Sequence, residues 1–274
     1  MPYANNKGVK IYYEVEGEGP PLVLVPGMGG SLQGWRARGY TQELSKDHRL
    51  ILIDPRCFGK SDKPLDPSAY EFEARVGDLV AVLDDLKIDK ADYFGYSMGG
   101  KIGYRVPIYA PQRFSSLIIG GMGYPITGKE EWEDPIGLRT QTDLENALKE
   151  APENPMEYFA ASREKRTGVK ILPEQRRIML ANDARAWLVY VRKSRSMVSP
   201  KAEEVLPKFK IPCLIFAGEK DTWFPAAKES AASIPGARFF SLPGLDHGQT
   251  INRIDLVLPH IKKFLAEVNR KQGE

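Results

Sequence analysis

The stretch that decides the fold is Gly95-Tyr96-Ser97-Met98-Gly99. It follows Asp92-Tyr93-Phe94 and continues into Gly100-Lys101-Ile102-Gly103-Tyr104, which predicts a strand, a sharp turn at the serine and then a helix. A serine on such a turn has its hydroxyl lifted clear of the backbone, and it needs small neighbours because strand and helix crowd together there. The pattern alone is a weak signal. Other strand ends must decide whether Ser97 is a nucleophile or an idle surface residue.

The size and charge of the chain exclude several classes of protein. Its 274 residues suffice for one large domain or a core with an insert. The net charge of +3, from 39 basic and 36 acidic residues, indicates a mixed surface and no nucleic-acid footprint. Two cysteines, Cys57 and Cys213, cannot build a disulfide scaffold, and no apolar run is long enough to span a membrane. The N-terminal residues also lack an apolar signal core, so we expect a cytoplasmic protein with no membrane partner.

Buried strand patterns alternate with helical patterns along most of the chain. Residues 9–16 alternate in polarity and end at the turn cluster 17–21, which predicts a hairpin. The alternation of buried strands with helices along the chain predicts the α/β fold class: a mostly parallel, twisted sheet flanked by helices. Further strands are predicted at residues 22–25, 49–53, 92–95, 116–121, 212–217 and 237–242, and helices at 72–86 and 253–271.

The composition changes in the middle of the chain. Between about residues 122 and 199 clear strands disappear, and helical patterns at 142–149, 156–166 and 173–195 begin near prolines. We predict that residues 122–199 are a helical cap (lid) inserted into a core made of residues 1–121 and 200–274. The alternative is a longer helical excursion of the core without a lid role.

Aromatic residues of the predicted cap are candidates for an apolar pocket wall, which would favour an acyl or aromatic substrate over a highly charged one. We expect most of them to hold the cap helices together and one or two to reach the pocket. They are Trp132, Tyr158, Phe159, Trp187 and Tyr190.

Polar residues follow three of the predicted strands. In a parallel sheet ligands bind beyond the carboxyl ends of the strands, and Ser97 follows one such end. Asp221 lies in the loop after the strand at 212–217, with Glu219 as its nearest rival, and His247 lies in the loop after the last strand. The other histidines are His48, at the opposite end of the sheet, and His260, within the final helical pattern.

The order Ser97, Asp221, His247 predicts nucleophilic catalysis. Serine is a poor nucleophile at neutral pH, so His247 would take its proton, and Asp221 would hold the imidazole in the right tautomer. The oxyanion would be bound by the backbone N–H groups of Met98 and of Met28, which lies in the glycine-rich loop after an earlier strand. That loop lacks the spacing of a phosphate-binding loop, and no metal-ligand cluster is visible, so we predict no cofactor and no metal.

With these residues the chain resembles the α/β-hydrolase superfamily, in particular the capped serine esterase, lactonase and C–C hydrolase type. The resemblance covers about residues 9–121 and 200–270, and includes the segment 54–62, similar to the family's Asp-x-Arg-Gly-x-Gly-x-Ser loop. We expect purely structural roles for Asp54 and Arg56.

Two positions depart from the family pattern. Pro26 stands where the family usually has histidine, so the oxyanion loop is expected to be braced differently. Cys57 stands where the family usually has glycine, and it would carry strain if that position requires a positive φ.

The resemblance implies a cofactor-free serine hydrolase that cleaves a carboxylic ester or lactone through an acyl–Ser97 intermediate. Its partner would be a small-molecule ester, lactone or related carbonyl compound. A C–C bond hydrolase of the meta-cleavage type is one alternative, because its elbow also ends Ser-Met-Gly-Gly. A perhydrolase and a non-catalytic ligand-binding member of the fold are others. The residues leave the substrate open, and they leave open whether the chain forms a homo-oligomer.

Overall fold

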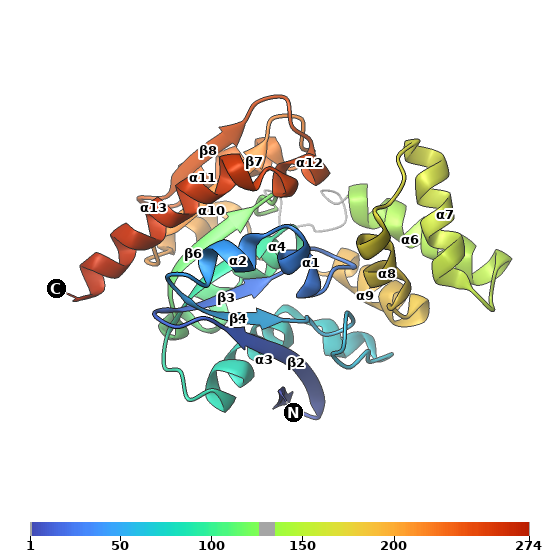
Figure 1. The fold of residues 1–274 in the computed structure, drawn as a ribbon, viewed down its shortest axis with the longest axis horizontal. Coiled ribbons are helices and arrows are strands. Elements are labelled where there is room, and N and C mark those ends of the chain that lie inside the picture. The colour runs from blue at the N-terminus through green and yellow to red at the C-terminus, as the bar shows by residue number, and fades with distance from the viewer. Residues whose placement is uncertain (1, 126–134, 274) are drawn as a thin grey trace.

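The computed structural model describes residues 2–125 and 135–273. The described residues form an eight-stranded sheet in the order β1-β2-β4-β3-β5-β6-β7-β8 (Figure 1). Within it, β1–β2 and β2–β4 are antiparallel pairs and the remaining neighbours run parallel, which confirms the predicted α/β class with a mostly parallel sheet. The strands are β1 (Tyr3–Asn6), β2 (Val9–Glu16), β3 (Pro21–Val25), β4 (Arg49–Ile53), β5 (Ala91–Tyr96), β6 (Phe114–Gly120), β7 (Cys213–Gly218) and β8 (Arg238–Leu242).

The predicted hairpin, in which the strand at residues 9–16 would turn at 17–21 and pair with the next strand, is wrong. Strand β2 forms its hairpin with β1, across the turn at Lys7 and Gly8, and its other neighbour is β4. Strand β3 lies between β4 and β5. The physical reason is burial: Leu22 to Val25 are all fully buried, so this strand belongs in the centre of the sheet, where both faces are covered.

Both faces of the sheet are covered by helices because strand side chains alternate between them. In β3, Val23 and Val25 face one helical layer, whereas Leu22 and Leu24 face the other. The first layer contains α3 (Phe72–Asp85), α4 (Met98–Gly103), α5 (Val106–Tyr109) and α11 (Phe224–Ser233). The second contains α1 (Gln33–Ala37), α2 (Tyr40–Leu44), α12 (His247–Asn252) and α13 (Ile254–Gly273).

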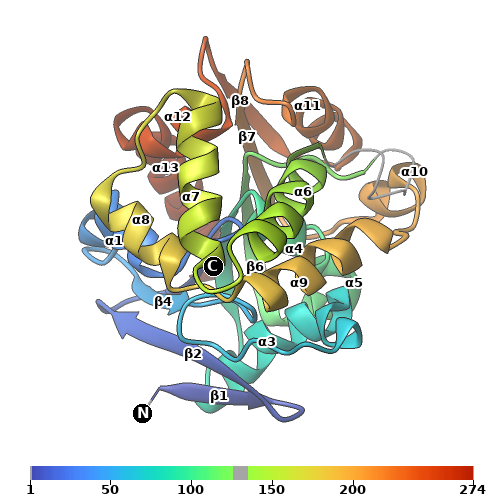
Figure 2. The same cartoon turned by 90° about the vertical axis from the view of Figure 1, so that its right-hand side faces the viewer.

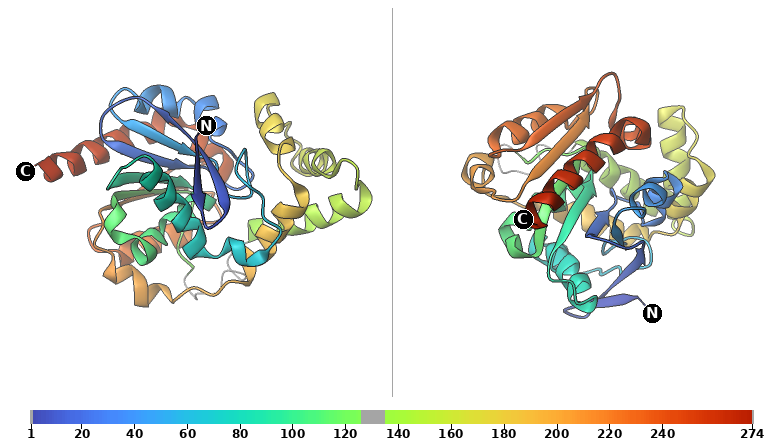
Figure 3. Two further views of the ribbon diagram at one scale, coloured as in Figure 1. Left: turned by 90° about the horizontal axis from the view of Figure 1, so that it is seen from below. Right: turned by 60° about the vertical axis from the view of Figure 1, so that its left-hand side comes forward.

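Helices α6 to α9 follow β6 and precede β7 in the chain and form a separate group. Figures 1 and 2 show this group beyond the carboxyl ends of the parallel strands, and Figures 1 and 3 show the C-terminal end of α13 on the opposite side of the molecule. The apolar residues of the α6–α9 group form a third cluster, which also includes Cys57, Phe58, Tyr70 and Met98 of the core. The helices are α6 (Pro135–Glu150), α7 (Pro155–Thr167), α8 (Pro173–Leu180) and α9 (Ala184–Ser196).

Local sequence explains where these helices begin. Proline occupies the first position of α6, α7 and α8, where its missing N–H costs nothing. The helical pattern predicted at 173–195 is in fact two helices, because the Asp183 carboxylate accepts a hydrogen bond from the Ala186 N–H at 2.8 Å and so caps a new helix.

Short elements complete the chain: α10 (Ala202–Val205) and the 3₁₀ turns Pro67–Tyr70, Pro111–Arg113 and Leu206–Lys208. None of the helices among the described residues has the length and apolar character needed to cross a membrane.

Candidate active site

Ser97 lies on the sharp turn between β5 and α4, as predicted. Its φ of 55° and ψ of −111° are rare for a residue with a side chain. The turn is held by main-chain bonds, since the Ser97 N–H donates to the Gly120 carbonyl and the Ser97 carbonyl accepts from the Lys101 N–H, each at 2.8 Å. Such a backbone persists only where the surroundings determine it, as they do here.

The glycines of the elbow are required by close packing. A Cβ atom on Gly99 would lie 2.2 Å from the Val25 carbonyl oxygen, and one on Gly95 would lie 2.4 Å from the Gly99 carbonyl. Real Cβ atoms do not approach backbone so closely. Strand and helix therefore meet at Ser97 only because these positions lack side chains, which confirms the steric argument made from the sequence.

The structure brings the three predicted residues into one hydrogen-bonded chain. His247 Nε2 lies 2.9 Å from Ser97 Oγ, and His247 Nδ1 lies 2.8 Å from Asp221 Oδ2. The Asp221 side chain is fully buried, and its Oδ1 accepts a hydrogen bond from the Trp223 N–H at 3.0 Å. The His247 side chain keeps 25% of its surface exposed. The histidine can therefore exchange protons with the serine on one side while the carboxylate holds its other nitrogen.

His247 is positioned by contacts that the sequence analysis did not identify. The Tyr96 hydroxyl donates to the His247 carbonyl at 2.6 Å, and burial raises the pKa of Tyr96 well above its usual value, so this donor stays protonated. A capping box fixes the start of α12: Asp246 accepts from the Gln249 N–H, and the Gln249 side chain accepts from the Asp246 N–H. The spacing Asp246-x-x-Gln249 was a visible signal of this cap.

The other candidate carboxylate and the other two histidines lie away from the hydrogen-bonded chain of Ser97, His247 and Asp221. Glu219 is exposed and accepts a hydrogen bond from the Ser241 hydroxyl at 2.9 Å. His48 is buried near Asn269 of α13. His260 stacks on Phe240, with ring centroids 4.1 Å apart.

Met28 and Met98, whose backbone N–H groups are the predicted oxyanion donors, both line the cavity beside Ser97. Met98 is the first residue of α4, so its N–H has no acceptor within the helix and is available to a ligand. Met28 lies in the loop after β3, and it lines one cavity together with Ser97 and Met98. This cavity has an empty volume of about 400 Å³, including the open solvent at its mouth.

The Met28 loop is braced without the family histidine, as the sequence analysis expected. The Asp54 carboxylate accepts from the Leu32 N–H at 2.7 Å, and the Asn182 side chain donates to the Gly29 carbonyl at 3.0 Å. Gly29 has a φ of +76°, and a Cβ on it would lie 2.3 Å from the Trp187 ring. The loop is therefore fixed by the core on one side and by the α6–α9 group on the other.

The loop after β4 has the structural roles predicted for it. Asp54 also accepts from the Lys60 N–H at 2.8 Å, and Arg56 forms a buried ion pair with Asp78, with Arg56 Nε 2.6 Å from Asp78 Oδ2. Cys57 is buried with a φ of 82°, a region that favours glycine, so the strain expected at this position is confirmed.

Of the candidate aromatic residues, Tyr190 of α9 lines the Ser97 cavity. Phe159 and Trp187 are buried in the cluster of the α6–α9 group, and Tyr158 packs against that cluster. Trp132 lies outside the described residues. The lining residues that the sequence analysis missed include Lys101, Ser194 and Trp223. The position of Lys101, four residues after Ser97, was a signal that the two share a helix face.

A mostly parallel sheet with serine, carboxylate and histidine joined at its strand ends is the arrangement of an α/β hydrolase. Residues 20–156 match the family model described as alpha/beta hydrolase fold. The chain belongs to this family and is a hydrolase.

Known relatives span several hydrolase activities. RutD of Azorhizobium caulinodans, named only as a candidate carbamate hydrolase, is 36% identical over 119 residues, 43% of each chain. A 2-hydroxymuconate semialdehyde hydrolase of a Pseudomonas species is 35% identical over 124 residues, 44% of each chain. These alignments span less than half of either relative. The enol-lactonase structure from Burkholderia xenovorans LB400 is 25% identical with a TM-score of 0.77, covering 97% of this chain and 100% of that one.

Proposed function

We propose that the protein is a serine hydrolase that cleaves a carboxylic ester or lactone through an acyl–Ser97 intermediate. The observation that carries this proposal is the unbroken chain Ser97 Oγ, His247 Nε2, His247 Nδ1 and Asp221 Oδ2, with both contacts at hydrogen-bond distance. In this arrangement a serine hydroxyl gains the adjacent base that it needs to act as a nucleophile.

Acylation follows from this geometry. Ser97 Oγ attacks the ester carbonyl carbon as its proton passes to His247 Nε2, and Asp221 stabilises the resulting imidazolium. The carbonyl oxygen becomes an oxyanion that the N–H groups of Met28 and Met98 bind. One such donor contributes about 2.7–4 kcal/mol of transition-state stabilisation. The intermediate then expels the alkoxide, which takes the proton from His247 Nε2 and leaves as the alcohol.

Deacylation repeats the same steps with water as nucleophile. His247 takes a proton from water, the hydroxide adds to the acyl carbon, and Ser97 leaves with the proton returned by the histidine. The products are the carboxylic acid and the alcohol, and the enzyme regains its starting protonation. In a lactone the acid and the alcohol stay joined as one hydroxy acid.

We also propose that residues 122–199 act as a cap over this site. Helix α9 supports the proposal, because its residues Tyr190 and Ser194 line the same cavity as Ser97. Trp187 of the same helix lies against Gly29 of the oxyanion loop. Substrate selection would then depend on cap side chains, whereas the chemistry depends on the core.

A C–C bond hydrolase is the second candidate. It is favoured by the 35% identity of the aligned segment to a 2-hydroxymuconate semialdehyde hydrolase. Such an enzyme would use the same Ser97 and His247 on a vinylogous diketone.

The test compares wild type and Ser97→Ala on p-nitrophenyl esters of graded acyl length. We expect the wild type to release p-nitrophenol and the variant to lose this activity, with equal thermal unfolding of both proteins as the control for folding. Activity that survives in Ser97→Ala would refute the proposal. An inactive wild type that instead cleaves a vinylogous diketone would favour the second candidate.

A further inference from the structure

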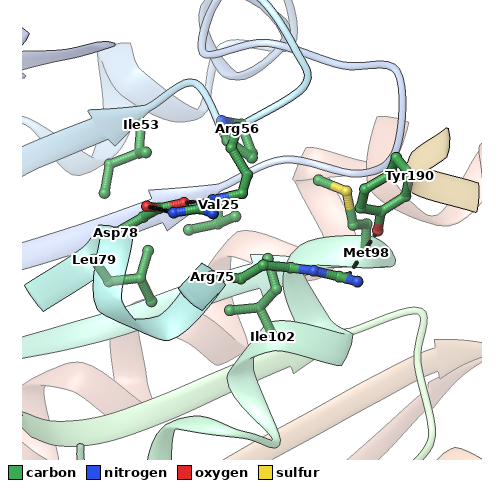
Figure 4. A pocket seen from close by; sticks show the side chains of 10 residues that line it. Val25, Ile53, Arg56, Arg75, Asp78, Leu79, Met98, Ile102 and Tyr190 are labelled. Atoms are coloured by element: carbon green, nitrogen blue, oxygen red, sulfur yellow. Dashed lines mark hydrogen bonds and ion pairs between the residues drawn. The ribbon is translucent and has the colours of Figure 1, made fainter. Parts of the chain in front are cut away.

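A buried arginine ties the α6–α9 group to the core directly behind the Ser97 cavity. Arg75 of α3 is only 2% exposed. Its Nε donates to the Tyr70 carbonyl at 2.7 Å, while its terminal nitrogens donate to the Tyr190 hydroxyl at 3.1 Å and to the Ser194 hydroxyl at 2.8 Å. Figure 4 shows the guanidinium of Arg75 pointing toward the Tyr190 hydroxyl, beside Met98. The hydroxyl groups therefore stand between a buried positive charge and the cavity.

The positive charge of Arg75 is not matched by a carboxylate of its own. Among residues 2–125 and 135–273 no acidic side chain forms an ion pair with Arg75. Asp78, which lines the same small cavity as Arg75, is ion-paired with Arg56 (Figure 4). Two buried guanidinium groups thus share one carboxylate, which leaves an excess of positive charge beneath Met98 and Tyr190.

The hydrogen bonds from Arg75 also decide what the two hydroxyl groups can do. Each hydroxyl oxygen accepts a hydrogen bond from Arg75, so its own O–H hydrogen must point to another acceptor. Within the part of the chain that the structure describes, neither the Tyr190 nor the Ser194 hydroxyl donates to a protein acceptor. Both residues line the cavity of Ser97, and both are almost completely buried. The cavity wall thus offers two O–H donors with a cation behind them.

A cavity bordered by hydroxyl groups that a buried guanidinium backs favours an anionic occupant, since charge-assisted hydrogen bonds are about twice as strong as neutral ones.

We propose that the substrate of the Ser97 site carries a carboxylate group, which accepts hydrogen bonds from the Tyr190 and Ser194 hydroxyls and is attracted by the Arg75 guanidinium behind them. The inference rests on the proposed ester or lactone hydrolysis and adds the charge class of the substrate. The sequence alone predicted an acyl or aromatic substrate. The proposed substrate keeps an acyl chain that lies against apolar side chains and adds one negative charge that lies against the Tyr190 and Ser194 hydroxyls.

The test compares two esters of equal acyl length that differ in charge, mono-p-nitrophenyl adipate and p-nitrophenyl hexanoate. We expect wild type to have a higher kcat/KM for the anionic ester. Tyr190→Phe and Ser194→Ala should each lower the ratio of the two kcat/KM values by about 10-fold, the effect of one hydrogen bond to a charged group. Added salt should weaken the preference in wild type.

Tyr158→Phe is the matched control, because it also deletes a tyrosine hydroxyl from the α6–α9 group but at a residue that packs against the cluster instead of lining the cavity. Its ratio should equal that of wild type. Hydrolysis of the neutral ester with no preference for the anionic one would overturn the inference and leave the proposed function standing. A preference that survives in both Tyr190→Phe and Ser194→Ala would overturn it as well. If neither ester is cleaved, the proposed function fails and the inference with it.

Discussion

Replacing Asp221 by Asn perturbs the proposed mechanism at one proton while keeping the shape of the side chain. In the native protein Asp221 Oδ2 faces His247 Nδ1 at 2.8 Å, and Oδ1 accepts from the Trp223 N–H at 3.0 Å. The asparagine oxygen must keep the Trp223 bond, because the main-chain N–H can only donate. The amide nitrogen then faces His247 Nδ1 and makes that atom an acceptor.

The tautomer that results cannot act as a base toward Ser97. With Nδ1 accepting, the ring proton sits on Nε2, the atom that lies 2.9 Å from Ser97 Oγ. A wrong tautomer in such a chain lowers kcat by about 10⁴. This factor corresponds to about 5.5 kcal/mol of activation free energy. The stability cost should be much smaller, about 1 kcal/mol, because one hydrogen bond is weakened and no cavity is created.

The assay is the rate of p-nitrophenyl butyrate hydrolysis, with thermal unfolding measured on the same preparations. Glu219→Gln is the matched control, because Glu219 is the neighbouring carboxylate in the same loop and its side chain accepts a hydrogen bond from the Ser241 hydroxyl. It should retain wild-type kcat. A loss of less than 10-fold in folded Asp221→Asn would refute the role of Asp221 in orienting His247.

Three further predictions concern stability. Gly99→Ala should prevent folding, seen by circular dichroism, because its Cβ would lie 2.2 Å from the Val25 carbonyl; native-like spectra and melting would contradict this. Arg56→Met should lower the free energy of unfolding in urea by about 3–5 kcal/mol, because it leaves the buried Asp78 charge unpaired; a loss below 1 kcal/mol would be inconsistent. Burial raises the pKa of Asp92 from 3.8 to about 6, so its protonated form stabilises the fold below pH 4, and this contribution of roughly 3 kcal/mol disappears as pH rises through 6. Asp92→Asn should remove that part of the pH dependence, and an unchanged profile in urea titrations would refute it.

The elbow could be predicted from the sequence because its constraints are local. The glycines at 95 and 99 and the positive φ of Ser97 all arise within a few residues. The positive φ of Cys57 was expected only from the resemblance, because the family usually has glycine at this position. Asp221 and His247 could be predicted because each follows a strand, and parallel strands bring their carboxyl ends to one edge.

Other features depend on packing between distant segments and could not be predicted. The hairpin partner of β2 was wrong, because an alternating strand next to a turn does not specify which neighbour pairs with it. The contacts of Arg75 were missed for a similar reason: Ser194 lies 119 residues away, and its hydroxyl meets the guanidinium only when α9 packs over α3.

The sequence by itself determined the alternation of strands and helices, the turn at Ser97 and the loops that carry Asp221 and His247. Apolar periodicity and glycine sterics act over short distances along the chain, so they can be identified without coordinates. Only the tertiary structure decided that His247 Nε2 lies 2.9 Å from the hydroxyl of a serine 150 residues away, and that Arg75 bonds two hydroxyl groups that line the Ser97 cavity. Such contacts between residues distant in the sequence depend on strand order and on the packing of α9 against the core, which local residue patterns do not specify.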